Sequence, residues 1–561
     1  MSKRNTKLVL HKRKKGSHRN RKKIAVQGEV KQKEGDNMLY KNEQAEINAQ
    51  ITFNQHENRE TVLPEQNECE RNECASLSEL DDRSVILYTT DESCGHSMSV
   101  IKFLSDNGEE LYGIVDCGMM MPQETRDKNV ISRVSEINRK LPVNDDEICK
   151  IKFILITHSH DDHCGLIPYI VHKGYDGPIY MTEVCKEEMP LILSDCNNIS
   201  RKEGFVLYND KDISKALSLM QSIKYDRIFT AYYDRKIRIL VNANFSAHLE
   251  GACSYLIQFW FNEESLPANI VFSGDIKVHN EFIIDRFLQT WVSNLPVTIV
   301  CESTYGGTFS NQVRTDCFEE NVANIYNRGG NVVIASIANE RVEILLHRLY
   351  LMKVNGMIPY DTKIYVKGWL AQNLFYIIRM NRDKIGIPRN YTFDFREIEF
   401  MTGKDITPPG NYIMIATPGM LKAGSSLKAA IKESQNPLSG LILTSYVPPT
   451  GIAKKFLTIP KGEEIVLPSG ERICKKFDVF QYTGISGHCK ADEIKKYFLD
   501  EFNAKLSVIL NHGDRENQEK FKSYLINEYN GNVPVYIASR KKAFRISSNG
   551  VEEVLFSDIN N

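Results

Sequence analysis

The stretch THSHDDH at residues 157–163 follows an apolar run that predicts a buried strand, and it holds four potential metal ligands within six residues. Side chains two residues apart in an extended chain project from the same side, so His158 and His160 can bind one ion. Asp162 and His163 lie in the following turn and can face a second ion. Imidazole and carboxylate ligands together suit zinc, or manganese as a harder substitute. A merely polar loop is disfavoured, because His and Asp side chains this close are costly to pack without a cation.

The chain on both sides of this stretch alternates apolar strands with helical segments. Several strands end directly in polar residues that can do chemistry, as 151–158 does. The segment 340–352 predicts a helix, since its apolar residues recur on one face. Strands that alternate with helices indicate an α/β fold. The predicted strands are 84–90, 100–104, 110–116, 151–158, 269–275, 297–303, 331–337 and 507–514.

Composition excludes several classes of protein. The 561 residues are 42% hydrophobic and 25% charged, which rules out a fully disordered chain, a collagen-like chain and a small disulfide scaffold. The formal net charge of -1 conceals two oppositely charged segments. Residues 1–23 hold eleven Lys or Arg and no acid, whereas 34–82 hold thirteen acids and three bases. We expect residues 1–83 to form a disordered extension, whose basic arm either is solvated or binds nucleic acid.

The sequence also bears on the cellular compartment. No stretch approaches the roughly 18 apolar residues that a membrane helix needs, so no membrane contact is expected. The basic N-terminal run lacks the apolar region of a secretory signal. The 13 cysteines form an odd set without CxxC pairs, which suits free thiols in a reducing compartment. We therefore expect a cytoplasmic protein.

The motif HSHDDH at 158–163 matches the HxHxDH signature of the metallo-β-lactamase superfamily. The resemblance continues in order over about residues 84–530. Asp116 in GIVDCG matches the first-motif aspartate, and His248 in AHLEGA matches the third-motif histidine. Asp275 in FSGD matches the fourth-motif aspartate, which bridges two metals in this superfamily. An ordered set of motifs at compatible spacings is far more specific than any one of them.

Further motifs narrow the resemblance to the β-CASP branch, the nucleases of nucleic-acid processing. Glu302 in CESTYGG resembles motif A, His488 in ISGHCKADEI resembles motif B, and His512 in ILNHGD resembles motif C. IASIANERVEILL at 334–346 is similar to the segment usually written IPxFAxGRxQELL, and ATPGMLKAGSS at 416–426 is similar to SxGMLxxG. The motif B wording is closest to ribonuclease J, and motif A to the cleavage and polyadenylation endonucleases.

The chain departs from the branch at three places, none of which carries a predicted metal ligand. Lys490 stands two residues after the motif B histidine, where the family usually has Asp. GWLA at 368–371 replaces an SPLA-like stretch, and SCGHSMSV at 93–100 lacks the common GxxxEVGRS wording. These differences leave the substrate path and the choice between cutting internally and cutting from the 5′ end open.

The resemblance implies a fold and a division into domains. The fold would be a metallo-β-lactamase αββα sandwich with an inserted α/β β-CASP domain. The 185 residues between Glu302 and His488 are about what the insertion requires. The predicted parts are the extension at 1–83, the first part of the metallo-β-lactamase domain at 84–305, the β-CASP domain at 306–480 and the return segment at 481–561.

The resemblance also implies a two-metal site. Two zinc ions would share a bridging hydroxide that attacks phosphorus in line, with manganese as a possible substitute. One ion would be held by His158, His160, His248 and Asp275, and the other by Asp162, His163, Asp275 and His512.

Four of the predicted site residues would have catalytic roles by the same resemblance. His488, once protonated, would hydrogen-bond a phosphate oxygen or give a proton to the leaving 3′ oxygen. Glu302 would orient His488 and favour its charged form. Asp116 would fix the tautomer of a ligating histidine, and Asp162 would serve through the second metal.

The predicted function is a metal-dependent nuclease that hydrolyses phosphodiester bonds, with single-stranded RNA as its partner. His512 favours RNA, because the DNA-repair nucleases of this branch usually lack a histidine at motif C. The alternatives are a DNA nuclease of the same family, a non-catalytic β-CASP scaffold subunit and a small-molecule hydrolase. Scaffold subunits characteristically lose ligands, whereas this chain keeps the full set. A homodimer is also compatible with the sequence.

Overall fold

The apolar strands near the predicted metal site belong to two large sheets. The first sheet has eight strands in the order β23-β22-β1-β2-β3-β4-β5-β6. Its centre is parallel, because β3, β4, β5 and β6 pair in parallel register. Its strands are β1 (Val85–Thr89), β2 (Ser99–Leu104), β3 (Glu110–Val115), β4 (Ile151–Leu155), β5 (Ile179–Thr182), β6 (Met220–Ile223), β22 (Lys542–Ile546) and β23 (Val551–Leu555).

The second sheet has seven strands in the order β21-β20-β11-β10-β9-β8-β7. Its inner face packs against the first sheet in one apolar core, to which Phe103 and Phe153 contribute from the first sheet and Tyr255 and Phe259 from the second. Its strands are β7 (Phe229–Tyr233), β8 (Arg238–Phe245), β9 (Cys253–Trp260), β10 (Ala268–Phe272), β11 (Val297–Glu302), β20 (Lys505–Asn511) and β21 (Val535–Ile537).

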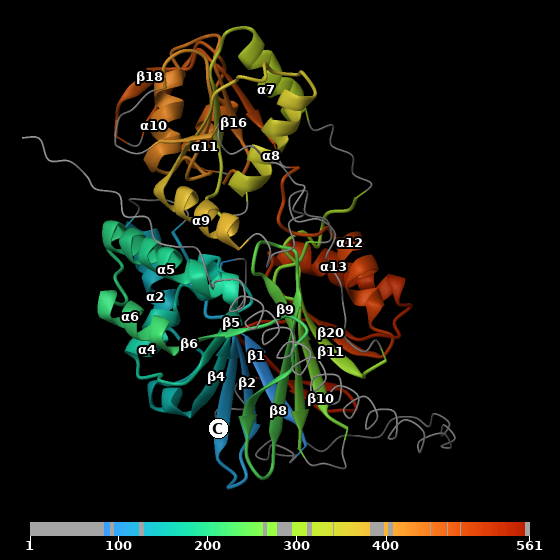
Figure 1. The fold of residues 1–561 in the computed structure, drawn as a ribbon. Coiled ribbons are helices and arrows are strands. Elements are labelled where there is room, and N and C mark those ends of the chain that lie inside the picture. Colours follow the sequence, from blue (N-terminus) through green and yellow to red (C-terminus); the bar gives the residue numbers. More distant parts are fainter. Residues whose placement is uncertain are drawn as a thin grey trace, which may run out of the picture. The chain divides into compact units, whose positions relative to one another are not determined.

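Helices cover the outer faces of both sheets (Figure 1). A second apolar core joins α4, α5 and α6 to the first sheet, and α13 lies on β20 and β21 of the second. This arrangement is the predicted αββα sandwich. The helices are α2 (Lys128–Arg139), α3 (Asp161–Cys164), α4 (Ile167–His172), α5 (Glu183–Glu203), α6 (Asp210–Leu219), α12 (Ala491–Tyr497) and α13 (Arg515–Glu528), with short 3₁₀ turns at Asp145–Lys150 and Leu499–Glu501.

A third sheet is built from the chain between β11 and β20 (yellow to orange in Figure 1). Its six strands are all parallel, in the order β14-β13-β15-β12-β16-β19. Its strands are β12 (Val332–Ala335), β13 (Ile364–Lys367), β14 (Ile398–Phe400), β15 (Ile413–Ala416), β16 (Gly440–Leu443) and β19 (Asp478–Gln481), accompanied by α7 (Phe318–Asn327), α8 (Arg341–Val354), α9 (Trp369–Met380), α10 (Gly424–Glu433), α11 (Ile452–Thr458) and a small hairpin of β17 (Glu464–Val466) and β18 (Arg472–Cys474).

The third sheet is an insertion into the sandwich. Strands β11 and β20, which flank it in sequence, are direct parallel neighbours in the second sheet. The chain after β20 then completes both sandwich sheets, with β21 in one and β22 and β23 in the other. The inserted α/β domain of the predicted fold is thus confirmed, while the boundaries at 305 and 480 stay predictions.

This computed structural model describes residues within the unit 77–561. No helix in the described part is long and apolar enough to cross a membrane. The predicted extension lies outside the described residues except for Arg83, the last residue of that range. The described ranges are 83–89, 95–122, 128–261, 266–277, 294–310, 317–339, 341–381, 398–401, 408–448, 450–467, 469–482 and 484–555.

The predicted strands correspond to real ones, with ends that shift by one or a few residues. The helix predicted over 340–352 is α8, which begins at Arg341. Strands β5 to β9, β13 to β19 and β21 to β23 were not predicted. Strand β7 is partly exposed along its whole length, and its residues do not alternate strictly between apolar and polar.

Phe153 tests the core of the sandwich. It is fully buried opposite Gly113 on β3, where an added Cβ would lie 2.3 Å from the Phe153 ring. We expect Phe153→Ala to lower the free energy of unfolding by about 3–5 kcal/mol, because it leaves a cavity between the sheets. Urea unfolding followed by circular dichroism measures this loss. Tyr233→Ala, at a 70% exposed position in the same sandwich, is the control and should change stability by less than about 0.5 kcal/mol.

Candidate metal centre

The predicted site residues gather at one edge of the sandwich. Parallel strands end at the same edge of a sheet, and β3 pairs in parallel with β4, as β11 does with both β10 and β20. Each of these strands runs directly into a predicted site residue. The residues that follow or end these strands are Asp116 (β3), His158 (β4), Asp275 (β10), Glu302 (β11) and His512 (β20).

Three imidazole rings converge to form the first ligand group. His160 Nδ1 lies 3.1 Å from both His158 Nε2 and His248 Nε2. One oxygen of Asp275, Oδ2, lies 3.6 Å from each of the same two Nε2 atoms. Ligands on a tetrahedral zinc ion with Zn–N bonds of 2.0–2.1 Å are separated by about 3.3 Å. The four side chains therefore have the spacing that one metal ion requires.

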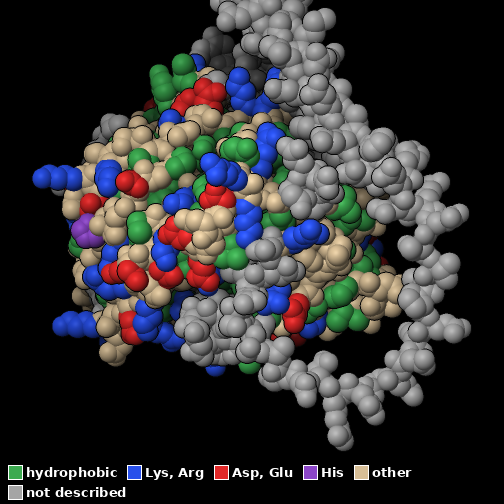
Figure 2. Space-filling model, turned by 90° about the horizontal axis from the view of Figure 1, so that it is seen from below, with side chains coloured by type: hydrophobic (Ala, Val, Ile, Leu, Met, Phe, Trp, Pro, Cys, Tyr) green, Lys and Arg blue, Asp and Glu red, His purple; other side chains and the backbone are tan. Residues whose placement is uncertain are grey.

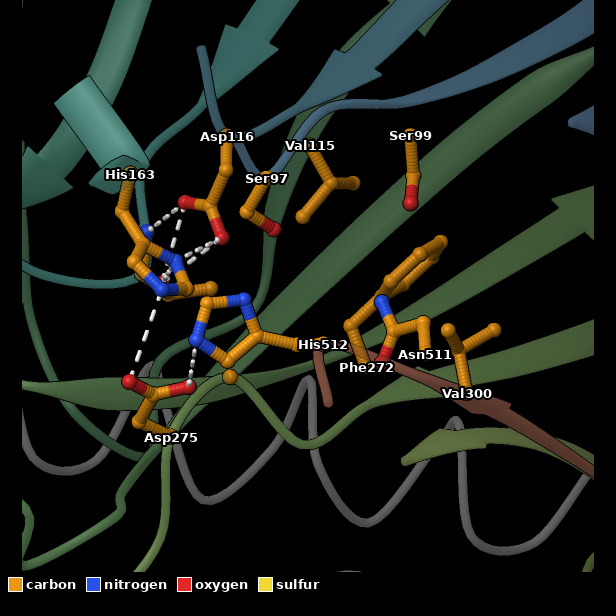
Figure 3. Close-up of a pocket in the computed structure, with 12 residues that line it drawn as sticks. Ser97, Ser99, Val115, Asp116, His163, Phe272, Asp275, Val300, Asn511 and His512 are labelled. Atoms are coloured by element: carbon orange, nitrogen blue, oxygen red, sulfur yellow. Dashed lines mark hydrogen bonds and ion pairs between the residues drawn. The ribbon is translucent and has the colours of Figure 1, made fainter. Parts of the chain in front are cut away.

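The second ligand group consists of Asp162, His163 and His512. Asp275 contacts this group too, with Oδ2 3.4 Å from His163 Nε2 and Oδ1 3.7 Å from His512 Nε2 (Figure 3). Asp162 Oδ2 lies 3.9 Å from His512 Nε2. The carboxylate of Asp275 thus lies between the two groups, where it can serve both.

The protonation of the first group suits a metal. Burial lowers the pKa of His160 to about 4 and holds the pKa values of His158 and His248 well below the usual value. These imidazoles are therefore neutral near pH 7, which is the form that binds a cation. Buried His163 Nε2 and Asp275 Oδ1 have no hydrogen-bond partner among the described residues, as expected of atoms that face a metal.

The second group lies in a strongly negative environment. Burial by itself lowers the pKa of His163, but the charges of Asp275 and Asp116 outweigh it and raise this pKa well above the usual value. Burial likewise opposes ionisation of Asp275, yet the surrounding histidines hold its pKa well below the usual range. A bound cation would offset the same negative charge without a proton. Both groups therefore fit metal ions.

Asp116 supports the site from behind. Its carboxylate accepts hydrogen bonds from His163 Nδ1 at 2.8 Å and from the backbone N of Thr157 at 2.8 Å. The proton of His163 is thereby placed on Nδ1, which leaves Nε2 free for a metal. Gly118 lets this loop approach closely, since a Cβ there would lie 1.7 Å from the carbonyl oxygen of Asp162.

His488 and Glu302 form a pair beside the first group. His488 Nδ1 donates to Glu302 Oε2 at 2.9 Å, while Glu302 Oε1 accepts from the backbone N of Ile276 at 2.8 Å. Burial lowers the pKa of His488, but the charges of Glu302 and Asp275 and the hydrogen bond to Glu302 raise it to about 9. His488 therefore carries a proton near pH 7, next to the metal ligands.

Two features of the site were not predicted from the sequence. His248 Nδ1 donates to the backbone carbonyl of Gly487 at 2.5 Å, and a backbone acceptor has no residue signal. A small cavity also extends between the sheets behind His512, lined in part by Ser97, Ser99 and Asn511 (Figure 3). The sequence feature that could have indicated this cavity is the pair of polar residues at the ends of β2 and β20, Ser99 and Asn511.

Comparison with protein families agrees with the geometry. Residues 94–197 match the metallo-β-lactamase superfamily, and residues 473–538 match the Zn-dependent metallo-hydrolase RNA specificity domain. These matches include ligands from both groups, and the second match begins just before β19, the last strand of the inserted parallel sheet.

The chain therefore resembles the β-CASP branch of the metallo-β-lactamase superfamily.

Curated relatives are similar over about two thirds of the chain. An Integrator complex subunit 11 homolog from Dictyostelium discoideum is 29% identical over 409 residues, which is 67% of this chain and 51% of the relative. The transcription termination factor FttA from Methanothermobacter thermautotrophicus is 27% identical over 64% of this chain and 58% of its own length. Endoribonuclease ysh1 from Schizosaccharomyces pombe is 28% identical over 71% and 52%, respectively. The chain thus spans just over half the length of these relatives.

Lys490, which departs from the usual β-CASP motif, lies where two loops of the site meet. Its backbone N donates to Glu493 Oε2 at 2.8 Å at the start of α12, and the residue forms a β-bridge with Tyr305. Lys490 therefore joins the motif A loop to the motif B loop through its backbone, which any residue other than proline can do.

Replacing Asp116 tests the support of the metal ligands. Asp116→Asn should weaken zinc binding by about 10–100-fold, because it removes the charged acceptor that fixes the His163 tautomer. Competition with a chelating dye measures the affinity. Asp226→Asn is the matched control, since Asp226 has a similar backbone φ of 57° against 61° for Asp116 but lies in neither ligand group. Equal affinities for the two variants would contradict this role.

Proposed function

We propose that this chain is a ribonuclease that depends on two zinc ions. The observation that carries the proposal is the convergence of the complete ligand set on one carboxylate, that of Asp275, with the His488–Glu302 pair beside it. Bound zinc ions would supply a water of lowered pKa and positive charge to offset that of the phosphate. Manganese, a harder ion that accepts the same ligand types, is the expected substitute.

The residues of the chain supply positioning and a proton. His488 is protonated and can donate from Nε2 to a phosphate oxygen or to the leaving 3′ oxygen, because its Nδ1 is held by Glu302. Glu302 is itself held by the backbone N of Ile276, so the His488 ring is fixed from behind. Asp116 holds His163 of the second ligand group in place, and Asp162 is itself a ligand in that group.

RNA is the substrate that the comparisons favour. The RNA specificity domain match at 473–538 contains both His488 and His512. One relative is named an endoribonuclease, and we propose internal cleavage for this chain as well. A DNA nuclease of the same branch remains the alternative substrate class. A scaffold subunit is less well supported, because the predicted ligands lie in two groups, and the ligand atoms of each group are within 4.8 Å of one another.

Electrostatics indicate where RNA would bind. On the face that Figure 2 shows, Lys and Arg side chains of the described residues are interspersed with Asp and Glu. Such a mixed surface gives little net attraction for a polyanion. We therefore propose that RNA is held at the metal centre, with the basic arm at 1–23 as a second contact.

Loss of one imidazole tests the metal-dependent cleavage. Protein supplied with zinc or manganese should cut single-stranded RNA, and His160→Ala should reduce the rate to less than about 1% of wild type, because the first ligand group is then incomplete. Cleavage of end-labelled RNA on a denaturing gel measures the rate. His172→Ala is the control, since His172 lies on α4 of the same domain with an exposed side chain.

Two outcomes would overturn this function. Wild-type protein with full metal occupancy that leaves RNA intact but degrades DNA would be a DNA nuclease. Protein that binds both metals yet cleaves neither nucleic acid would be a scaffold subunit.

Circular RNA tests internal cleavage. A circle has no 5′ end, so only an endonuclease converts it to a linear product. We expect the wild-type protein to linearise a single-stranded RNA circle, and the linear form migrates differently on a denaturing gel. Linear RNAs of the same sequence with a 5′-monophosphate or a 5′-triphosphate are the controls. Degradation of the monophosphate form alone would show a 5′-exonuclease instead.

A further inference from the structure

Ser159 lies between two ligands of the first group, His158 and His160. Its side chain is fully buried and makes two hydrogen bonds. The hydroxyl donates to Glu188 Oε2 at 2.5 Å and accepts from Asn339 Nδ2 at 2.9 Å. Ser159 thus uses its one hydroxyl proton in the hydrogen bond to Glu188 and its oxygen in the hydrogen bond from Asn339.

The two partners belong to different domains. Glu188 lies on α5 of the sandwich and is 0% exposed, whereas Asn339 is 5% exposed in the loop between β12 and α8 of the inserted domain. A continuous chain of hydrogen bonds therefore runs from the inserted domain, through the metal loop, to the helix behind it. Water is excluded from all three side chains, so a lost bond has no ready replacement.

This contact is not part of the family signature. Ser159 occupies the open position of HxHxDH, and Asn339 occupies an open position of the segment that resembles IPxFAxGRxQELL. Other cross-domain bonds end elsewhere on the sandwich. Asn381 Nδ2 donates to Glu187 Oε2 at 2.6 Å, and Lys422 Nζ donates to the carbonyl of Pro122 at 2.7 Å.

We propose that Asn339 is a positioning residue for the metal site. By holding Ser159, it fixes the backbone that sets the spacing of His158 Nε2 and His160 Nδ1. The placement of the inserted domain is thereby coupled to the affinity for the first metal ion. The inference rests on the metal binding in the proposed function, but it requires no assumption about the substrate.

Zinc affinity of the full chain is the test, with zinc alone as the probe. We expect Asn339→Ala to weaken zinc binding at the first ligand group about tenfold, as for other residues that orient metal ligands. Asn381→Ala is the matched control: it removes a bond of the same kind between the same domains and should leave affinity within about twofold of wild type. Competition with a chelating dye gives the affinities.

Ser159→Ala is the second variant, which removes the hydroxyl that both partners bind and keeps the backbone and the Cβ. It should weaken zinc binding to a similar extent, and the double variant with Asn339→Ala should show no further loss, because both act on one contact. The unfolding temperature of the metal-free protein checks each variant, and it should fall equally for Asn339→Ala and Asn381→Ala.

The outcomes separate the inference from the proposed function. Equal zinc affinities for Asn339→Ala and Asn381→Ala would overturn the role of Asn339. Additive losses in the double variant would show that the two residues act independently, which also contradicts the proposal. A wild-type chain that binds no zinc would instead refute the metal site itself.

Discussion

The rest of the site must stabilise one carboxylate that is buried among histidines. Asp275 is 2% exposed and has four imidazoles within 3.7 Å of its oxygens. A lone buried charge is very costly, so the surroundings must either give it positive partners or leave it protonated. Here they hold its pKa well below the usual range, and the fold therefore maintains an anion in its interior. Metal ions would satisfy this anion and the neutral histidines of the first group together.

Parallel pairing explains how residues so far apart in sequence meet at this anion. Strands β4, β10, β11 and β20 each end at the same edge, and a residue predicted to ligate or orient lies at the end of each strand or within three residues after it. The insertion leaves the second sheet at the end of β11 and returns before β20, so Glu302 and Asn511 are still paired residues. The motif B histidine comes with the returning chain. The third sheet is therefore inserted without breaking the pairing of β11 with β20.

Much of this arrangement could be predicted from the sequence. The HxHxDH loop, the apolar strands and the ordered motifs indicated the sandwich, the insertion and the seven His and Asp side chains that cluster at the site. Strand β7 escaped because its alternation is weak, and Gly487 escaped because a carbonyl group is common to every residue. The contact of Asn339 with Ser159 joins residues 180 positions apart on two domains, and no local pattern encodes such a pairing. Local physics thus specifies elements and ligand types, whereas contacts between domains require the folded chain.

The pairing of β11 with β20 also affects how the chain folds during its synthesis. On the ribosome, β11 ends at Glu302 while its partner β20 begins only at Lys505, so the whole inserted domain is synthesised between them. Until then β11 is an unpaired edge of apolar residues, which invites association with other chains. Pairing across such a long separation in sequence also folds slowly. Early folding of the inserted domain shortens the free chain between the two strands, so the order of synthesis favours completing that domain before the sheet is closed.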